Sequence, residues 1–294
     1  MKKSVLMWML AGTLLATSCG TVPLTGRSQL NLVSDSEVLQ SGLSAYTSFM
    51  QTATVSTDKV QSEQVTRVGK RIAAATEKYL TQNGLASEVK NYSWEFNLVK
   101  DSQVNAFCMP GGKIVVYEGL MKLVNSDDDL AVVLGHEVAH AVAKHSNERL
   151  SQQMLAQYGG QAVGAILQNK SYQTQAIAQQ VYGLGANYAV ILPFSRKHES
   201  EADYIGLALM SLAGYTPDTA VTFWQKMSSN SGGSKVSELL STHPSDATRI
   251  SDIKKNLPAI KQKFYTAPVT TTTSAATKSS AKTTKTTKKS TKKK

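Results

Sequence analysis

The apolar residues of this chain recur mostly at helical spacing, with a few short stretches that alternate as strands do. The capping box Ser34-Asp35-Ser36-Glu37 predicts the start of a helix that runs toward Met50, and a second helix is expected over about Ser62–Leu80. The segments 91–99 and 113–117 alternate between apolar and polar side chains. The pattern predicts an α+β protein that is mainly α-helical and contains a small sheet.

A further helix is predicted after Ser126, where three aspartates follow the serine. A serine N-cap and an acidic first turn suit the positive end of a helix dipole, and the next apolar residues are three and four positions apart. This helix carries His136, Glu137 and His140 in the pattern H-E-x-x-H. Histidines four residues apart share a helix face and can bind one ion, while the glutamate can contact the water on that ion. The pattern therefore indicates a zinc peptidase site.

The third zinc ligand is expected on another element, because a catalytic site has three protein ligands and one open position. The segment 198–206 places Glu199 and Asp203 on one helix face, while Glu201 lies about 200° from Glu199 and should point away. We expect Glu199 to be the third ligand and Asp203 to accept the free N–H of one ligand histidine. Gly206 extends the same face and would let a neighbouring helix approach closely.

Three further stretches make the pattern more specific than any single motif. Residues 105–114 read N-A-F-C-M-P-G-G-K-I, residues 117–121 read Y-E-G-L-M, and Thr242-His243-Pro244 precedes Arg249. In this order, with H-E-x-x-H and E-x-x-A-D, they resemble the gluzincin zinc metallopeptidases of the CaaX prenyl endopeptidase family, which includes the HtpX and BepA-type proteases. The resemblance is to a soluble lipoprotein branch and covers nearly the whole folded part. Cys108-Met109 departs from the small apolar pair that is commoner in the family.

The resemblance implies a zincin-like metallopeptidase domain, with a small β-sheet beside the H-E-x-x-H helix and one zinc ion per chain. An edge strand in gluzincins pairs with the extended substrate, so Asn105, Ala106 and Phe107 are expected to bind the peptide backbone. Plain core packing explains Phe107 equally well. Glu137 is expected to take a proton from water and pass it to the leaving amine, with Asp203 orienting a ligand histidine.

Two residues near the C-terminal end of the domain, His243 and Arg249, each have more than one possible role. The T-H-P loop lies near the metal in the family that this chain resembles. His243 therefore either hydrogen-bonds a tetrahedral oxyanion or occupies the open zinc position and holds the enzyme inactive. Arg249 either stabilises the oxyanion or pairs with a carboxylate. A structural hydrogen-bonding role accounts for both residues equally well.

The sequence says less about the roles of the other histidines, of Cys108 and of the segment 150–195. His145 lies about 140° round the helix from His140, which favours a surface or capping role. His198 is expected to point away from the metal, and nothing supports Cys108 as a catalytic thiol. The segment 150–195 contains a single charged residue and is predicted to form two helices, which either pack on the catalytic core or form a lid or docking surface.

The N-terminal region is predicted to direct export. Residues 1–18 combine two lysines with a short apolar core, as a signal peptide does. Cys19 follows a stretch that resembles a bacterial lipoprotein cleavage box and would become the lipidated first residue, although ordinary signal cleavage near it is an alternative. Residues 19–33 would then form the lipidated anchor and an irregular linker, and residues 34–265 the metallopeptidase domain.

The net charge of +11 comes almost entirely from the chain ends. Eight lysines lie in the Thr/Lys-rich tail 266–294, and removing them together with Lys2 and Lys3 leaves +1. The nearly neutral charge of the domain is therefore no reason to expect nucleic acid as a partner. The tail has too few apolar residues to bury a core and is expected to be disordered. It either contacts an anionic envelope surface or acts as a solubilising spacer.

Together these features predict a zinc metalloendopeptidase in the envelope of a bacterium, as an outer-membrane lipoprotein that faces the periplasm. The family resemblance implies protein or peptide substrates, namely unfolded or misassembled envelope proteins. A non-hydrolytic chaperone or scaffold with the same fold is the alternative, and the two hypotheses differ in whether Glu137 is needed. Surface binding through the tail, with the domain as cargo, is a third.

Overall fold

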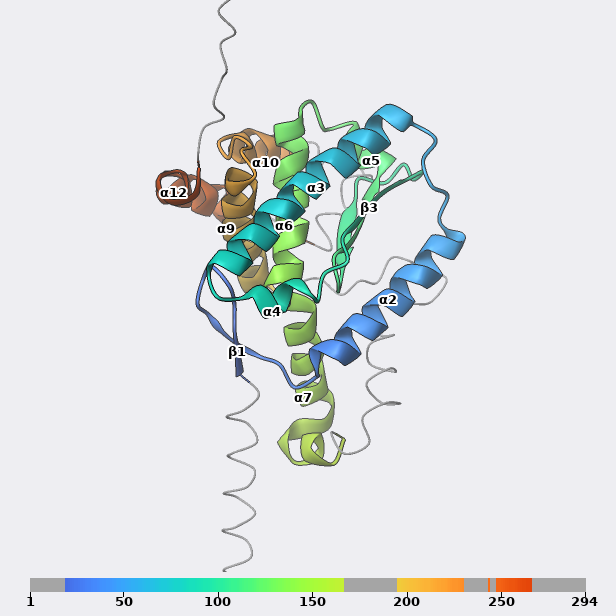
Figure 1. The fold of residues 1–294 in the computed structure, drawn as a ribbon, viewed down its shortest axis with the longest axis vertical. Helices are drawn as coiled ribbons and strands as arrows, with labels where there is room; N and C mark the ends of the chain where they lie inside the picture. The colour runs from blue at the N-terminus through green and yellow to red at the C-terminus, as the bar shows by residue number, and fades with distance from the viewer. Residues whose placement is uncertain (1–18, 167–194, 230–242, 244–246, 266–294) are drawn as a thin grey trace, which may run out of the picture.

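The computed structural model describes residues 19–166, 195–229, 243 and 247–265, and it confirms a mainly helical α+β fold (Figure 1). The helices are α2 (Asp35–Thr52), α3 (Lys59–Gln82), α4 (Ala86–Val89), α5 (Glu118–Met121), α6 (Asp127–Val142), α7 (His145–Ile166), α9 (Arg196–Leu212), α10 (Thr219–Ser229) and α12 (Ala247–Phe264). The strands are β1 (Cys19–Thr21), β2 (Ser28–Leu30), β3 (Glu95–Val99), β4 (Ala106–Met109) and β5 (Lys113–Tyr117).

The larger sheet has the strand order β3-β5-β4, with β3 parallel and β4 antiparallel to β5. All five residues of β5 are buried, so its two faces serve two parts of the core. Ile114 and Val116 join the cluster formed with α3, α6 and α9, while Val115 and Tyr117 join the one formed with α2 and α7. This split follows from the alternation of side chains along a strand. It leaves β4 as an edge strand beside α6.

Helix α6 begins at Ser126, whose hydroxyl accepts a hydrogen bond from the Asp129 N–H at 3.1 Å. It is buried on nearly every side and packs most closely on α9. A Cβ atom at Gly206 would lie 2.8 Å from the backbone nitrogen of His136, and one at Gly135 would lie 2.8 Å from the Gly206 carbonyl oxygen. The expected close approach at Gly206 is therefore confirmed. It brings the H-E-x-x-H face against the start of α9.

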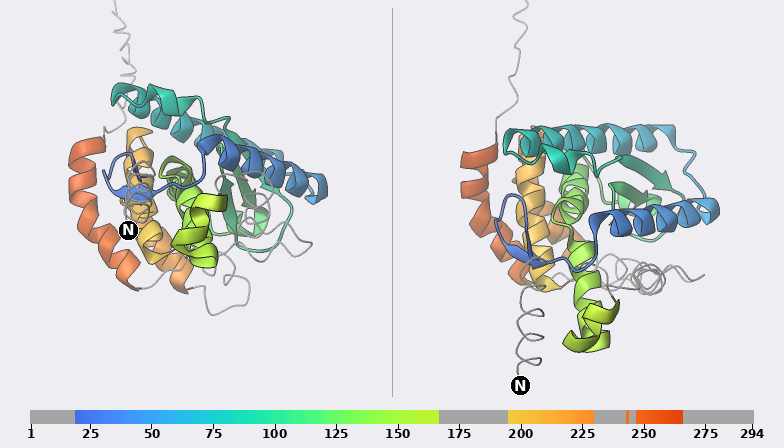
Figure 2. Two further views of the ribbon diagram at one scale, coloured as in Figure 1. Left: turned by 90° about the horizontal axis from the view of Figure 1, so that it is seen from below. Right: turned by 60° about the horizontal axis from the view of Figure 1, so that its bottom comes forward.

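Residues 19–33 do not form the irregular linker that the sequence suggested. Strand β1 pairs antiparallel with β2, and Val22 beyond β1 is buried in the main core. The connecting turn needs left-handed backbone at Leu24 and Gly26, with φ of 68° and 69°. The resulting hairpin, residues 19–30, lies beside α9 and the start of α7, as Figure 2 shows. Strands of three residues carry too little alternation to be recognised in the sequence.

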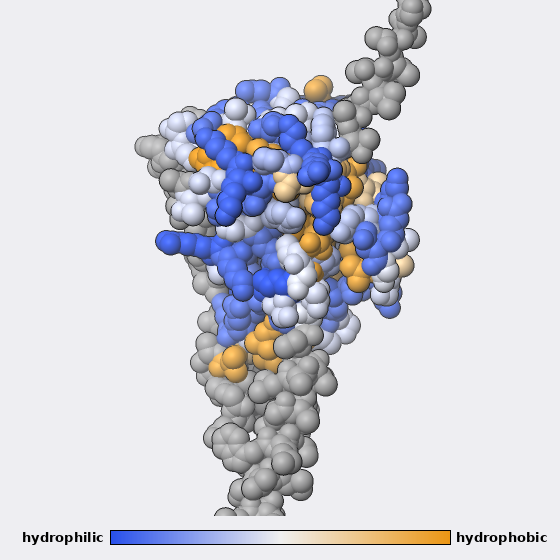
Figure 3. Space-filling view, turned by 90° about the vertical axis from the view of Figure 1, so that its left-hand side faces the viewer, coloured by the Kyte–Doolittle hydropathy of each residue, from blue (hydrophilic) through white to orange (hydrophobic). Residues whose placement is uncertain are grey.

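Helices α10 and α12 complete the structure by packing on α9 and α6. The face of the molecule on the α12 side is mostly hydrophilic, with apolar groups showing between the polar side chains (Figure 3). Exposed apolar groups of this kind are common on protein surfaces. In the part of the chain that the structure describes, no helix has the length and apolar character needed to cross a bilayer.

Several boundaries differ from the sequence-based expectation. Only residues 95–99 of the alternating segment 91–99 form a strand, because α4 and a turn precede it. Helix α7 continues to Ile166, and the rest of the segment expected to form two further helices lies outside the described residues. The signal segment 1–18 and the tail 266–294 also lie outside them.

Candidate metal centre

Four buried side chains converge between α6, α9 and the segment before α12. His136, His140, Glu199 and His243 each offer one ligand atom, and these atoms lie within 4.8 Å of one another. The two Nε2 atoms of His136 and His140 are 3.1 Å apart, and Glu199 Oε2 lies 3.2 Å from His136 Nε2. Ligands of a tetrahedral zinc ion with bonds of about 2.0–2.1 Å are about 3.3 Å apart. The donor set and its spacing therefore fit zinc.

His243 takes the fourth corner of this cluster. Its Nδ1 lies 3.2 Å from His136 Nε2 and 3.1 Å from Glu199 Oε1. Its Nε2 lies 3.5 Å from Glu137 Oε1. His243 is thus placed where a catalytic zinc site keeps a position open for water.

The carboxylates of the cluster differ in their electrostatics. Glu137 is 2% exposed, and burial raises the pKa of its carboxyl above the ordinary value. Burial would do the same for Glu199, but His243 and His136 outweigh it and hold the Glu199 pKa well below its usual range. Glu199 is therefore ready to bind a cation, whereas Glu137 is closer to a group that exchanges a proton.

Asp203 and Arg249 form a buried bridge behind His136. Asp203 Oδ1 lies 3.0 Å from His136 Nδ1, and Arg249 donates from Nε and Nη2 to the two Asp203 oxygens at 2.6 Å each. The Arg249 guanidinium also lies over the Trp224 ring, 3.6 Å from its centroid. A carboxylate can only accept, so this contact places the proton of His136 on Nδ1 and directs Nε2 toward the metal. Of the two alternatives for Arg249, the structure has the pairing with a carboxylate.

Nearby charges decide the protonation of His136. Burial and Arg249 lower its pKa, but Glu199 and Asp203 outweigh them and raise it to about 9. A zinc ion must therefore displace a proton from His136 near neutral pH.

The expectation that His145 lies on the surface is wrong. The side chain is fully buried, its Nδ1 lies 2.9 Å from His140 Nδ1, and its Nε2 lies 3.0 Å from Glu201 Oε2. The rotation that predicted a surface position assumed one continuous helix. Helix α6 ends at Val142, however, and Lys144 with φ of 52° redirects the chain into α7.

Glu201 and His198 complete a second buried cluster beside the metal centre. Glu201 points away from Glu199, as expected, but it binds His145 and the hairpin residue Arg27. His198 lies 3.1 Å from Glu148 Oε2, and its ring stacks on that of His145. Burial lowers the pKa of His145 to about 4, which leaves this imidazole neutral. Sequence reasoning missed this cluster, because its partners are far apart along the chain.

The expected substrate segment lies at the sheet edge. Ala106 and Phe107 belong to β4, and Asn105 directly precedes it. The Phe107 ring packs into the core, 5.2 Å from the Phe49 centroid, so its side chain has a structural role. Asn105 is 5% exposed, and its Oδ1 has no hydrogen-bond partner among the described residues.

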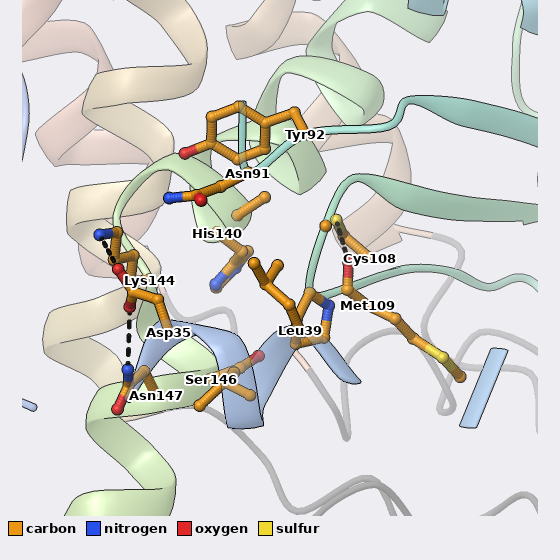
Figure 4. Close-up of a pocket in the computed structure, with 14 residues that line it drawn as sticks. Asp35, Leu39, Asn91, Tyr92, Cys108, Met109, His140, Lys144, Ser146 and Asn147 are labelled. Atoms are coloured by element: carbon orange, nitrogen blue, oxygen red, sulfur yellow. Dashed lines mark hydrogen bonds and ion pairs between the residues drawn. The ribbon is translucent and has the colours of Figure 1, made fainter. Parts of the chain in front are cut away.

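A small hollow with a cavity volume of about 40 Å³ opens beside His140, between the end of β4 and the start of α2 (Figure 4). Its walls are mostly apolar and include Val38, Leu39, Tyr92, Met109, Pro110 and His140. Cys108 also lines it, and burial raises the pKa of this thiol well above its usual value. A thiol held in the neutral form is a poor nucleophile, so Cys108 is not supported as a catalytic group.

Comparisons with known proteins support the assignment of a metal centre. The model of Peptidase family M48 matches residues 60–257. The chain is 38% identical over 204 residues to the mitochondrial metalloendopeptidase OMA1 of Schizosaccharomyces pombe, covering 69% of this chain and 55% of that protein. It is 25% identical over 268 residues to the beta-barrel assembly-enhancing protease of Escherichia coli, covering 87% of this chain and 52% of that protein.

The chain thus spans about half the length of these curated relatives. The family match confirms the expectation of a metallopeptidase with a zinc centre. It also accounts for the order in which the motifs occur, since the matched region runs from α3 into α12. The chain therefore belongs to Peptidase family M48.

Proposed function

We propose that this chain is a zinc-dependent endopeptidase of a bacterial cell envelope that hydrolyses unfolded or misassembled envelope proteins. The observation that carries the proposal is the buried set of His136, His140 and Glu199, with the carboxylate of Glu137 beside it. The substrate class draws on the name of the Escherichia coli relative, which assists the assembly of β-barrels.

Glu137 is the proposed general base and acid. When bound, zinc lowers the pKa of a coordinated water and polarises the scissile carbonyl. Glu137 takes a proton at its carboxylate and later passes it to the leaving amine, and its raised pKa suits both transfers. Asp203 keeps the His136 proton on Nδ1 throughout, since Arg249 fixes both of its oxygens.

His243 is the proposed gate of the resting centre. Its Nδ1 lies within 3.2 Å of both His136 Nε2 and Glu199 Oε1, so it takes the place that a water needs. Of the three roles left open by the sequence (oxyanion binding, inhibition and structural hydrogen bonding), this position favours holding the enzyme inactive. His243 must swing away before water can be activated, and its Nε2 contact with Glu137 breaks in the same movement.

The substrate is proposed to bind as an added strand along β4. Among the described residues this strand is the sheet edge next to α6, and an extended peptide would pair with its outer backbone groups. The carboxamide oxygen of Asn105 is buried without a hydrogen-bond partner among the described residues, so it would have to become exposed to accept a peptide N–H at the start of that edge. The hollow beside His140 would take an apolar side chain near the scissile bond.

Anchoring at Cys19 is proposed as the route to the outer membrane, with the domain facing the periplasm. The hairpin begins at Cys19, so a lipid there would lie directly next to the folded domain. Radiolabelled palmitate should enter the wild-type protein and not Cys19→Ser, and equal labelling of both would exclude lipidation at Cys19.

Deleting residues 266–294 tests the proposed role of the tail. Unchanged retention of the shortened protein on anionic vesicles would exclude a membrane role for the tail.

The decisive experiment is cleavage of casein by the purified, zinc-loaded protein. We expect wild type to cleave and Glu137→Gln to lose activity by about 10²–10⁴-fold, because a general base contributes that much. Glu63→Gln, an exposed glutamate on α3, is the matched control and should retain activity. If wild type and Glu137→Gln both bind zinc but neither cleaves casein, the result would support the chaperone alternative. Equal cleavage by wild type and Glu137→Gln would contradict the proposed site.

A further inference from the structure

The second buried cluster connects the metal centre to the N-terminal hairpin. We propose that His145, Glu201 and Arg27 are positioning residues that fix the tautomer and ring orientation of the zinc ligand His140. The hairpin is then part of the metal centre and sets its affinity for zinc. The inference rests on the zinc centre of the proposed function, but its main test measures metal binding and not catalysis.

The tautomers along this bridge follow from the chemistry of Glu201. A carboxylate only accepts hydrogen bonds, so the contact of 3.0 Å places the proton of His145 on Nε2. The other ring nitrogen, Nδ1, must then accept, and it lies 2.9 Å from His140 Nδ1. His140 therefore donates from Nδ1 and keeps the lone pair of Nε2, which faces His136 and Glu199. That is the form of histidine that binds a metal through Nε2.

Two hairpin residues hold Glu201 in place. Arg27 donates from Nε to Glu201 Oε2 at 2.7 Å, and the Thr25 hydroxyl donates to Glu201 Oε1 at 2.6 Å. Both carboxylate oxygens are thus fixed from the turn between β1 and β2. Arg27 also donates from Nη1 and Nη2 to the two oxygens of Glu148 on α7, at 2.9 and 2.7 Å. Charge-assisted contacts of this kind give strong geometric control.

A second contact fixes the plane of the His145 ring. His198 stacks on it with 4.5 Å between the centroids and 26° between the planes. His198 is held in turn by Glu148, which is bound to Arg27. Arg27 therefore acts on His145 through both Glu201 and Glu148. Withdrawing the hairpin would leave two buried carboxylates without their shared arginine.

The main experiment measures the zinc affinity of the full chain by competition with a chromogenic chelator. We expect His145→Phe to weaken zinc binding about 10–100-fold, as removal of a residue behind a metal ligand does. His145→Gln supplies both an acceptor and a donor and should recover most of the loss. Arg27→Ala should also weaken binding, whereas Arg67→Ala is the matched control. Arg67 forms an exposed ion pair with Asp127 far from the metal.

Unchanged zinc affinity in both His145→Phe and Arg27→Ala would overturn the proposal. The melting temperature of each zinc-free variant separates positioning from general damage. If the phenylalanine variant fails to fold, the imidazole ¹⁵N spectrum of the zinc-loaded wild type decides. A proton on Nε2 of His145 supports the bridge, and a proton on Nδ1 overturns it. Wild type that binds zinc but cleaves nothing would defeat the proposed function while leaving this test valid.

Discussion

The two histidines of one motif are positioned by opposite ends of the chain. The Asp203 bridge (His136, Asp203 and Arg249) joins the metal centre to α12, and the His145 bridge (His140, His145, Glu201 and Arg27) joins it to the hairpin. In each bridge a carboxylate contacts an imidazole, and an arginine holds that carboxylate by hydrogen bonds. The first reaches its ligand directly, whereas the second needs an additional imidazole.

The difference lies in rigidity. Arg249 is 4% exposed, sits on a helix and stacks on Trp224, while Arg27 has 15% of its side chain exposed and sits in a turn. The longer bridge also contains a histidine–histidine hydrogen bond, in which the tautomers of the two rings must agree. We infer that the Asp203 bridge contributes most to stability, and that the His145 bridge is the more easily perturbed. The following predictions test this contrast.

Asp203→Ala should have the largest effect. It leaves Arg249 buried without the carboxylate that binds it, and breaking a buried pair in this way costs about 3–5 kcal/mol of unfolding free energy. Zinc affinity should fall about 10–100-fold as well, since His136 loses its acceptor. Urea unfolding of the zinc-free protein and chelator competition measure the two effects.

Asp203→Asn is the control, because its amide oxygen can still accept from His136. It should retain more zinc affinity than Asp203→Ala. The comparison between the bridges fails if Arg27→Ala lowers the unfolding free energy by more than Asp203→Ala does.

Gly206→Ala should affect both bridges at once. The added methyl would meet the backbone nitrogen of His136 at 2.8 Å, and α9 carries both Glu201 and Asp203. Such overpacking costs about 1–3 kcal/mol of unfolding free energy and should also reduce zinc affinity. Ser200→Ala, an exposed change on the same helix, should alter neither quantity. Retained affinity in Gly206→Ala would mean that the helix spacing does not govern the ligand geometry.

The two bridges should respond to pH in opposite directions in the zinc-free protein. His136 has a pKa raised to about 9, so its contribution to stability is present below about pH 6.5 and is lost as the pH rises through 9. His145 has a pKa lowered to about 4, so its contribution is present above about pH 6.5 and is lost as the pH falls through 4. Titration of the imidazole resonances by NMR would show this, and two similar midpoints would contradict it.

The metal ligands could be predicted from the sequence because they depend on local periodicity. His136 and His140 lie on one continuous helix, and Glu199 and Asp203 lie on another. Four-residue spacing fixes their shared faces whatever the rest of the fold does. Ser126 and Ser34 likewise cap their helices through residues three positions away, as expected.

The His145 bridge could not be predicted, for two physical reasons. Rotation per residue is meaningful only within one helix, and the chain turns at Lys144 before His145 begins α7. Arg27 and Glu201 are 174 positions apart, so no local pattern connects them. The hairpin that carries Arg27 has three-residue strands, and it contacts α9 and α7, which are distant along the chain.

Thr25→Val should give the smallest of these effects and tests the far end of the His145 bridge. It removes one hydrogen bond to Glu201 Oε1 while Arg27 still holds Oε2, so we expect a loss of about 1 kcal/mol of unfolding free energy. Zinc affinity should fall only a few-fold, because His145 keeps its acceptor. Thr47→Val is the matched control, since the Thr47 hydroxyl donates to a carbonyl of its own exposed helix face. If both variants bind zinc as wild type does while Arg27→Ala binds it weakly, the arginine alone orients Glu201.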